Sequence, residues 1–418
     1  MRETSEGRQL GALRQVPYMG VIFVVAEAMK LGFRNGHPDW CNLGQGQPEV
    51  GEMDGAPPRI GSIEILAEDH AYGPLEGTDE LREAVAAHYN RLYRDGRASR
   101  YAASNVAIAS GGRLALTRAF AALASVRIGY QLPDYTAYED MFNLHLGRLT
   151  SVGVRTREED GFGLTPDLFE GAVTDDDLAA FVISNPCNPT GNVLRDGKLD
   201  AVVRIARARG VTLLMDEFYS HFIYDRDAPV SAARYIEDVN EEPVLLFDGL
   251  TKCYRYPGWR VGWVVGPPAM VESMARTASA IDGGPSRIAQ RAALLALETD
   301  RADRETAALR RGFRAKRDEM VRRLSAMGIR CVPEPQSTFY CWATLRDLPA
   351  PYHDAMTFFR RALDRKVMTV PGAFFDVNPG KRRQGPSPYR NWMRFSFGPP
   401  MENMVVGLER LADMLRGA

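Results

Sequence analysis

The sequence lacks the cysteine and histidine patterns that hold disulfide frameworks and metal ions. Its five cysteines include no CxxC pair, and an odd number in a chain of 418 residues argues against a disulfide framework. The six histidines are equally dispersed, without the i to i+4 pairing that would place two of them on one helix face. We therefore expect no bound metal and a reducing compartment.

The sequence also lacks an excess of either charge and a long apolar run. With 52 basic and 53 acidic side chains the formal net charge is -1, so no global field draws the protein toward nucleic acid or an anionic membrane. One apolar stretch, residues 19–29, is interrupted by Glu27 and is too short to span a bilayer, which takes about 20 apolar residues. We predict a short buried or lid-like helix there, a cytoplasmic protein, and small-molecule partners with no nucleic acid and no membrane among them.

What is present is an ordinary globular composition and a regular alternation of elements. Apolar residues make up 45% of the chain and charged residues 25%, which is enough for a large core and a second domain. The candidate strands are 105–109, 126–131, 149–154, 180–184, 211–215, 244–247 and 262–265. The helical patterns between them are 79–93, 113–124 and 199–209. This alternation predicts a mostly parallel, doubly wound α/β sheet of seven strands, with ligands at the carboxyl ends of its strands.

The pattern changes after residue 300 to mixed α+β material. The expected elements there are a long charged helix at 303–327, strands around 339–345, helices near 352–365 and 402–415, and a long loop at 376–392. We expect a large domain over residues 51–300 and a smaller α+β domain made of residues 1–50 and 301–418.

A lysine follows the predicted strand 244–247 in the sequence LTKCYRYPGWRVGW. A lysine in this place can simply be solvated. In a partly desolvated, cationic pocket its pKa would fall, and the neutral amine of Lys252 could form a Schiff base. Arg260, eight residues later, supplies planar bidentate donors that suit a phosphate.

An acidic residue ends the predicted strand 211–215 and opens the motif DEFY. Asp216 can be an N-cap or a solvated strand end. The functional alternative is a buried carboxylate that pairs with a protonated pyridine nitrogen and keeps the ring an effective electron sink. Tyr219 either packs in the core or donates to the phenolate oxygen of that ring.

Two further turns follow predicted strands. In NPCNPTG, turn chemistry alone explains Asn, Pro and Gly, but the amide of Asn188 can also reach a ring oxygen. Gly111, Gly112 and Arg113 open a predicted helix, so their backbone N–H groups and the positive helix end can cradle a phosphate.

Two more residues complete the set of candidates. Tyr135, in PDYTAYE, can stack on a cofactor ring, although tyrosines near strand ends usually serve packing. Arg394, in MRFSFG, can clamp an α-carboxylate with its guanidinium fork, and its alternative is an exposed salt bridge.

These motifs, in this order, resemble the class I/II aminotransferases of fold-type I from about Asn42 to the C-terminus. The matching pieces are NLGQGQP, YGPLEGTDELREAV, SGGRLALTRAF, PDYTAYE, NPCNPTG, DEFY, LTK with Arg260, GGPSRIAQRAA, STFYCW, VPGAFF and MRFSFG. The resemblance implies a pyridoxal 5′-phosphate (PLP) cofactor. It also implies that Lys252 bonds to the cofactor and later shuttles a proton, and that Asp216 binds the pyridine nitrogen.

The same resemblance assigns the rest of the ring contacts and the substrate contacts. Asn188 and Tyr219 would bind the ring hydroxyl oxygen, and Tyr135 would stack on the ring. Arg394 and the backbone near Gly46 would hold the substrate carboxylate.

The phosphate contacts implied by the resemblance come from two chains. Gly112, Arg113 and Arg260 would hold the phosphate from within the chain. The tyrosine that matches Tyr72 reaches the phosphate of the neighbouring subunit in this family, which implies a homodimer with shared active sites.

The sequence departs from the family pattern in several places. Gly249 stands three residues before the lysine, where the family commonly has a hydroxyl residue, so one phosphate contact is missing or is replaced, for instance by Thr251. Ser337 replaces a common glycine, and the basic loop 376–392 is long. These departures are typical of a divergent subgroup.

Three functions are therefore considered. The first is transfer of an amino group between an α-amino acid and a 2-oxo acid, with Lys252 as the base. The second keeps PLP and the first steps but ends in elimination, cyclisation or oxidation, as in specialised metabolism. The third is a PLP-binding protein without catalysis, which the presence of both Lys252 and Arg394 disfavours. No residue in the sequence indicates which side chain the amino-acid substrate carries.

Overall fold

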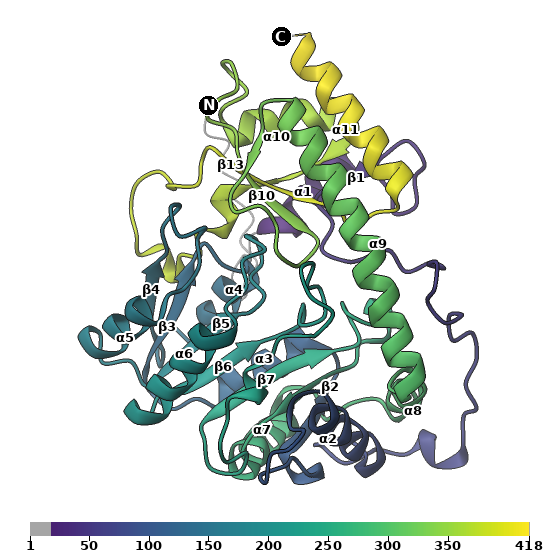
Figure 1. Ribbon diagram of the computed structural model, residues 1–418, viewed down its shortest axis with the longest axis vertical. Helices are drawn as coiled ribbons and strands as arrows, with labels where there is room; N and C mark the ends of the chain where they lie inside the picture. The colour runs from purple at the N-terminus through teal and green to yellow at the C-terminus, as the bar shows by residue number, and fades with distance from the viewer. Residues whose placement is uncertain (1–17, 418) are drawn as a thin grey trace, which may run out of the picture.

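The computed structural model describes residues 18–417 and is built around a seven-stranded sheet (Figure 1). The strand order is β2-β8-β7-β6-β5-β3-β4, and every strand runs the same way except β8, which is antiparallel to both neighbours. The strands are β2 (Val106–Ala109), β3 (Arg127–Leu132), β4 (Thr150–Arg155), β5 (Ala180–Ser184), β6 (Thr212–Asp216), β7 (Val244–Gly249) and β8 (Gly262–Val265). The expected mostly parallel α/β sheet is confirmed, and each strand lies within two residues of its expected bounds.

The central strands of this sheet form the core. All residues of β5 and β7 are buried, and so are all residues of β6 except the first. Continuous apolar runs of this kind are what strands covered by helices on both faces require. Because parallel strands end at the same edge, polar residues that end them or follow them come together there.

Helices connect the strands and cover the sheet. They are α2 (Asp79–Tyr93), α3 (Gly112–Ala122), α4 (Ala137–Asn143), α5 (Pro166–Asp175), α6 (Asp196–Arg209), α7 (Pro268–Ile281) and α8 (Arg287–Ala296). The expected helices at 79–93, 113–124 and 199–209 are confirmed as α2, α3 and α6, whereas α4, α5, α7 and α8 are findings of the structure. Local chemistry sets their ends: the hydroxyl of Thr165 caps α5, and Gly210 ends α6 with φ 67°, a conformation that favours glycine.

A second group of elements lies above this sheet in Figure 1 and contains a four-stranded antiparallel sheet of order β12-β13-β10-β9. Its elements are β9 (Arg330–Cys331), β10 (Tyr340–Thr344), β12 (Val370–Pro371), β13 (Trp392–Ser396), α10 (Ala355–Asp364) and α11 (Met401–Arg416). The strand expected around 339–345 is confirmed as β10, the expected helices are confirmed as α9 (Thr299–Ala326), α10 and α11, and β9, β12 and β13 are findings of the structure. The long helix α9 runs between the two groups (Figure 1).

The N-terminal segment joins this second group. The apolar stretch expected to be a helix is α1 (Gly20–Lys30), which contacts β12. The short strand β1 (Cys41–Asn42) pairs in parallel with β11 (Val367–Met368), far along the chain. The division into domains at residues 51 and 301 stays a prediction, and residues 1–17 of the expected smaller domain, like Ala418, lie outside the described residues.

The remaining segments are turns and short 3₁₀ helices. The 3₁₀ helices are η1 (Ala67–His70), η2 (Ala103–Asn105), η3 (Ala232–Arg234), η4 (Pro257–Trp259), η5 (Gly372–Phe375) and η6 (Pro379–Lys381). The loop 376–392 packs on α4, where the backbone N–H of Asn378 donates to Glu139 Oε2 over 2.8 Å. Across residues 18–417, no helix combines the length and apolar character needed to cross a membrane.

Candidate active site

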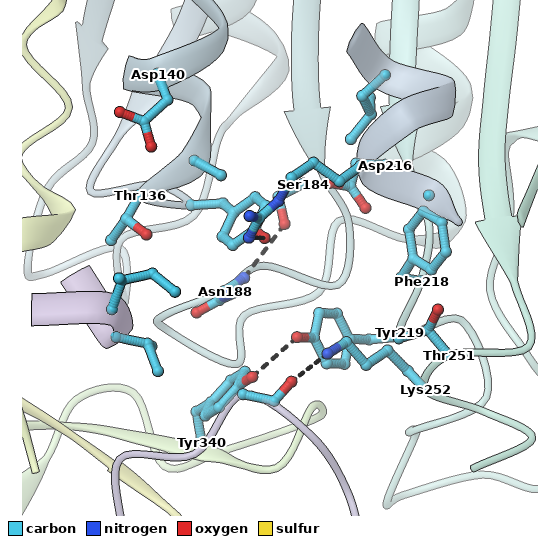
Figure 2. Close-up of a pocket in the computed structure, with 18 of the residues that line it drawn as sticks. Thr136, Asp140, Ser184, Asn188, Asp216, Phe218, Tyr219, Thr251, Lys252 and Tyr340 are labelled. Atoms are coloured by element: carbon cyan, nitrogen blue, oxygen red, sulfur yellow. Dashed lines mark hydrogen bonds between the residues drawn. The ribbon is translucent and has the colours of Figure 1, made fainter. Parts of the chain in front are cut away.

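A cavity of about 390 Å³ lies where the carboxyl ends of the central strands meet the second group of elements (Figure 2). It brings together eleven of the residues singled out from the sequence: Gly46, Gly112, Arg113, Tyr135, Asn188, Asp216, Tyr219, Thr251, Lys252, Arg260 and Arg394. Tyr72 does not line it, and its side chain is 96% exposed. Its expected contact with a neighbouring subunit stays a prediction.

Lys252 sits in the turn after β7 with its amine inside the cavity. Its Nζ donates to the carbonyl oxygen of Gly46. Burial, together with the positive charges of Arg394 and Arg113, lowers the pKa of the Lys252 amine to about 7. A large fraction of the amine is therefore neutral near pH 7, which is the form that attacks a carbonyl.

Asp216 is the last residue of β6, lines the cavity and is buried. Its Oδ2 accepts a hydrogen bond of 2.7 Å from the hydroxyl of Tyr138 on α4. Burial raises the pKa of Asp216 to about 6, although the Tyr138 hydrogen bond and the Lys252 charge oppose the rise. A buried carboxylate without a cationic hydrogen-bond partner is suited to pair with a protonated ring nitrogen.

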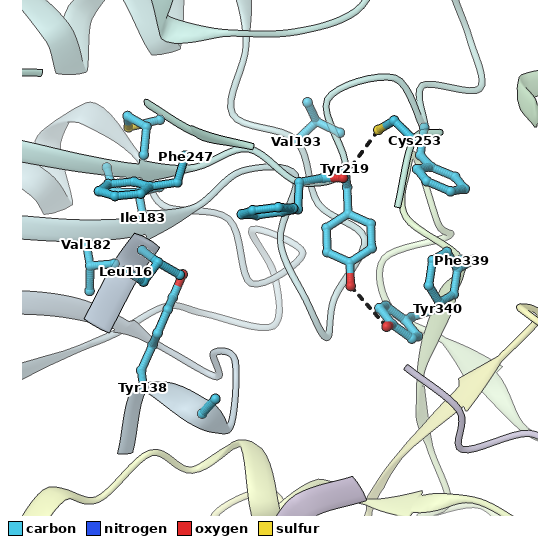
Figure 3. Close-up of a cluster of buried hydrophobic side chains, with 14 of the residues drawn as sticks. Leu116, Tyr138, Val182, Ile183, Val193, Tyr219, Phe247, Cys253, Phe339 and Tyr340 are labelled. Carbon is cyan, nitrogen blue, oxygen red and sulfur yellow. Dashed lines mark hydrogen bonds between the residues drawn. The ribbon is translucent and has the colours of Figure 1, made fainter. Parts of the chain in front are cut away.

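The hydroxyl of Tyr219 points toward a second tyrosine (Figure 3). Tyr219 Oη and Tyr340 Oη are 3.0 Å apart, and Phe339 packs against both rings. The sequence reasoning singled out neither Tyr340 nor Tyr138. No helix-face spacing marks Tyr138 in the sequence, because Tyr135 precedes α4 and only Tyr138 lies on it.

Arg394, on β13, closes the cavity from the side of the second sheet. Its Nη1 donates to Asn188 Oδ1 and its Nη2 to the Gly44 carbonyl oxygen, both over 2.9 Å, and the guanidinium carbon lies 4.0 Å from the centre of the Tyr340 ring. Its Nε is buried without a hydrogen-bond partner among the described residues. A buried guanidinium with spare donor capacity is a site for a carboxylate.

A cradle for an anion lies at the start of α3. Gly111 has φ 94°, and a Cβ there would lie 2.3 Å from Arg260 Nη2, so this arginine packs directly against the first turn of the helix. The partial positive charge of the helix end and the guanidinium act together on that spot. Arg113, the second residue of α3, also lines the cavity, where its Nη2 donates to Tyr135 Oη over 2.9 Å.

The structure explains why Gly249 replaces a hydroxyl residue. A Cβ at this position would lie 2.6 Å from the Val261 carbonyl oxygen and 2.7 Å from Gly262 Cα on the neighbouring strand. The close approach of β7 and β8 leaves no room for a side chain. Thr251, which also lines the cavity, is the nearby hydroxyl that remains.

The fold and the cavity together define an α/β enzyme with a reactive lysine, a buried carboxylate and an anion cradle at one edge of a parallel sheet. The chain belongs to the aminotransferase class I and II family, whose model matches residues 38–411.

Named relatives and solved structures agree with this assignment. The aspartate aminotransferase of Streptomyces avermitilis is 29% identical over 84% of this chain and 82% of its own length. The aspartate/prephenate aminotransferase of Thermus thermophilus is 30% identical over 82% of this chain and 83% of its own. The structure of Thermus thermophilus aspartate aminotransferase with maleate superposes with a TM-score of 0.78 at 26% identity, over 96% of this chain and 97% of that one.

Gly112→Ala is expected to weaken both the fold and cofactor binding. Its Cβ would lie 1.8 Å from Phe218 Cζ, so the ring below the cradle must move, and such overpacking costs about 1–3 kcal/mol. Thermal unfolding and cofactor titration by absorbance would measure the two effects. The control Gly171→Ala, on α5 with open space around its Cβ, should leave both near wild type. Equal results for the two variants would contradict the tight cradle.

Proposed function

We propose that this protein is a PLP-dependent aminotransferase that moves an amino group between an α-amino acid and a 2-oxo acid. The observation that carries the proposal is a single cavity in which Lys252, with a lowered pKa, faces the same space as Asp216 and Arg394. The family and the named aminotransferase relatives support it.

The chemistry of the cavity residues fits PLP at each end of the cofactor. The α3 cradle with Arg260 suits the phosphate, Asp216 suits the ring nitrogen, and Asn188 with Tyr219 suits the ring hydroxyl oxygen. Tyr135 would lie on the ring face. When bound, PLP supplies an aldehyde that accepts the amino group and an electron-poor ring that stabilises negative charge at the substrate Cα.

The residues of the chain would supply binding and proton transfer. The guanidinium of Arg394, with the backbone near Gly46, would hold the substrate carboxylate and so fix the direction of the Cα–H bond. The amine of Lys252 would take the proton from Cα, and its pKa of about 7 suits a base that works near neutral pH. Met19 and Ile22 contribute apolar side chains to the lining of the cavity.

The test is turnover of a panel of amino acids by the purified enzyme with PLP and a 2-oxo acid. We expect at least one amino acid to be converted to its keto acid while the acceptor gains the amino group, as followed by mass spectrometry. Elimination, cyclisation or oxidation products without a new amino acid would replace this proposal with another PLP reaction. Failure of every amino acid to yield a keto acid or any other product would remove it.

We further propose a cytoplasmic homodimer in which Tyr72 of one chain reaches the phosphate site of the other, and a two-domain division at residues 51 and 301. The exposure of the Tyr72 side chain, 96%, and its position outside its own cavity support the first point. All five cysteines are free thiols, which supports a reducing compartment.

A further inference from the structure

A buried ionic cluster lies next to the cavity on the chain that carries Lys252. At its centre is Arg255, three residues after the lysine, with a side chain that is 0% exposed. Its backbone has φ 56°, a left-handed conformation that a residue with a side chain adopts only when its surroundings hold it there. None of the roles described above for the cavity residues uses this arginine.

The guanidinium of Arg255 connects three segments of the chain. Its Nε donates to Glu305 Oε1 on α9 over 2.6 Å. Its Nη1 donates to the carbonyl oxygen of Gly51 over 2.8 Å and to that of Glu49 over 3.4 Å. The turn that carries Lys252, the segment 46–51 and the long helix α9 therefore meet at one side chain.

A second arginine, Arg59, contacts two of these segments, α9 and the turn that carries Lys252. Arg59 donates to Glu305 Oε1 over 3.1 Å and to the Arg255 carbonyl oxygen over 2.7 Å. It also lies 3.6 Å above the ring centre of Tyr256, which stacks on Trp259 just before Arg260. The cluster thus borders the turn that supplies both the lysine and the phosphate arginine.

Among the described residues, segment 46–51 accepts hydrogen bonds from Lys252 and from Arg255 of the same turn. Only the hydrogen bonds from Arg255 are independent of the reaction. Gly46 accepts from the amine of Lys252, but an amine that bonds to a cofactor cannot keep that hydrogen bond. The bonds from Arg255 to the carbonyl oxygens of Glu49 and Gly51 involve no reacting atom. Glu49 is also held by Lys316 on α9 and by the carbonyl oxygen of Gly398, so the contribution of Arg255 is to join this segment to the Lys252 turn.

We propose that Arg255 is a positioning residue for the reaction, which keeps the segment 46–51 in register with Lys252 and fixes both to α9. The proposal rests on the proposed function, in which Gly46 contributes to binding the substrate carboxylate. Arg255 touches no substrate itself and acts through the backbone of Glu49 and Gly51.

The test separates positioning from simple stability with paired variants. Arg255→Gln alone removes one of the two cationic partners of the buried Glu305 and leaves Arg59 as the other, so a loss of activity could reflect lost stability. The double variant Arg255→Gln with Glu305→Gln removes both charges of the pair, while Arg59 keeps its bond to the carbonyl oxygen of residue 255, and is expected to recover most of the lost thermal stability. It is not expected to recover catalysis: kcat/KM for the amino donor should stay about 10–100-fold low, because small displacements in a site of this kind cost that much.

Hydrogen exchange supplies a readout that does not depend on turnover. In the double variant with PLP bound, backbone amides of residues 46–51 should exchange at least about 10-fold faster than in wild type, while α9 stays protected. The matched control is Arg91→Gln with Asp303→Asn, another arginine–acid pair on α9, which joins α2 over 2.8 and 3.0 Å and touches neither segment. This control should leave exchange at 46–51 and kcat/KM unchanged.

Two results would overturn the inference. One is a double variant that regains wild-type kcat/KM and exchange together with its stability, which would make Arg255 a structural ion pair only. If the double variant does not fold, Arg255→Lys replaces it, because lysine can pair with Glu305 but lacks the second donor group that reaches Gly51. The second overturning result is an Arg255→Lys variant in which the amides of residues 46–51 exchange as slowly as in the wild type. A wild-type enzyme that converts no amino acid would instead refute the proposed function. The exchange measurement would still test whether Arg255 holds residues 46–51 in place.

Discussion

Lys252→Ala is expected to abolish turnover, by at least about 10⁴-fold, and to leave the fold intact. The variant loses the amine that bonds to the cofactor and the base that takes the Cα proton, and general acid–base catalysis alone contributes about 10²–10⁴-fold. The stability should not fall, because removal of an amine whose pKa burial has lowered to about 7 removes a group that folding disfavours in its charged form.

Covalent labelling gives the matching measurement. Borohydride reduction of the PLP-loaded wild type should fix the cofactor on the peptide that contains Lys252, as detected by its mass, and should leave that peptide unmodified in the variant. Lys198→Ala, which removes an exposed lysine on α6, is the control and should behave as wild type. In the cofactor-free protein, acylation of Lys252 should increase with pH up to about 7 and then level off, whereas exposed lysines gain reactivity up to about pH 10. Labelling of another lysine would contradict the assignment.

Asp216→Asn is expected to lower kcat/KM by about 10²–10⁴-fold while it stabilises the cofactor-free protein. Loss of one partner of a buried charge pair costs about 3–5 kcal/mol, and each 1.36 kcal/mol is a factor of ten in rate. In the cofactor-free protein, the same substitution is expected to stabilise the fold. The folded pKa of about 6 lies above the ordinary value of 3.8, so the neutral carboxyl group contributes stability that is fully present below pH 3.8 and is lost as pH rises through 6, when the buried group becomes charged.

Above pH 6, Asp216→Asn is expected to raise the free energy of unfolding of the cofactor-free protein by about 3 kcal/mol, because folding shifts the pKa of Asp216 from 3.8 to about 6. Thermal unfolding of cofactor-free wild type and variant from pH 4 to 8 should show curves that diverge as pH rises, with the variant more stable at pH 8. Asp227→Asn, at a side chain that is 95% exposed, should change neither stability nor kcat/KM. A variant that keeps wild-type activity would show that Asp216 does not pair with the ring nitrogen.

The sheet and the residues that end its strands were accessible from the sequence because they are local. The apolar runs of β5, β6 and β7 are continuous, and Asp216 and Lys252 stand at or just after their ends. In a parallel sheet this position along the chain predicts position in space, so both residues could be placed at one edge.

The partners that complete the site were not accessible in this way. Tyr138 reaches Asp216 across 78 residues, and Tyr340 reaches Tyr219 across 121. Such contacts depend on how helices and the second sheet dock, which no local pattern encodes. Arg255 illustrates the same limit: in the sequence it is one more basic residue after the lysine, and only its 0% exposure and its bonds to distant carbonyl oxygens set it apart.

The parallel pairing of β1 with β11 has a consequence for synthesis on the ribosome. Cys41 and Asn42 pair with Val367 and Met368, and α1 packs on β12, so the N-terminal segment lacks these packing partners until nearly nine-tenths of the polypeptide has been made. Lys252 is made before these partners, so the nascent chain carries the lysine turn before the N-terminal segment can dock on β11 and β12. We expect the newly made protein to become competent for its cofactor only after release of the C-terminal segment from the exit tunnel.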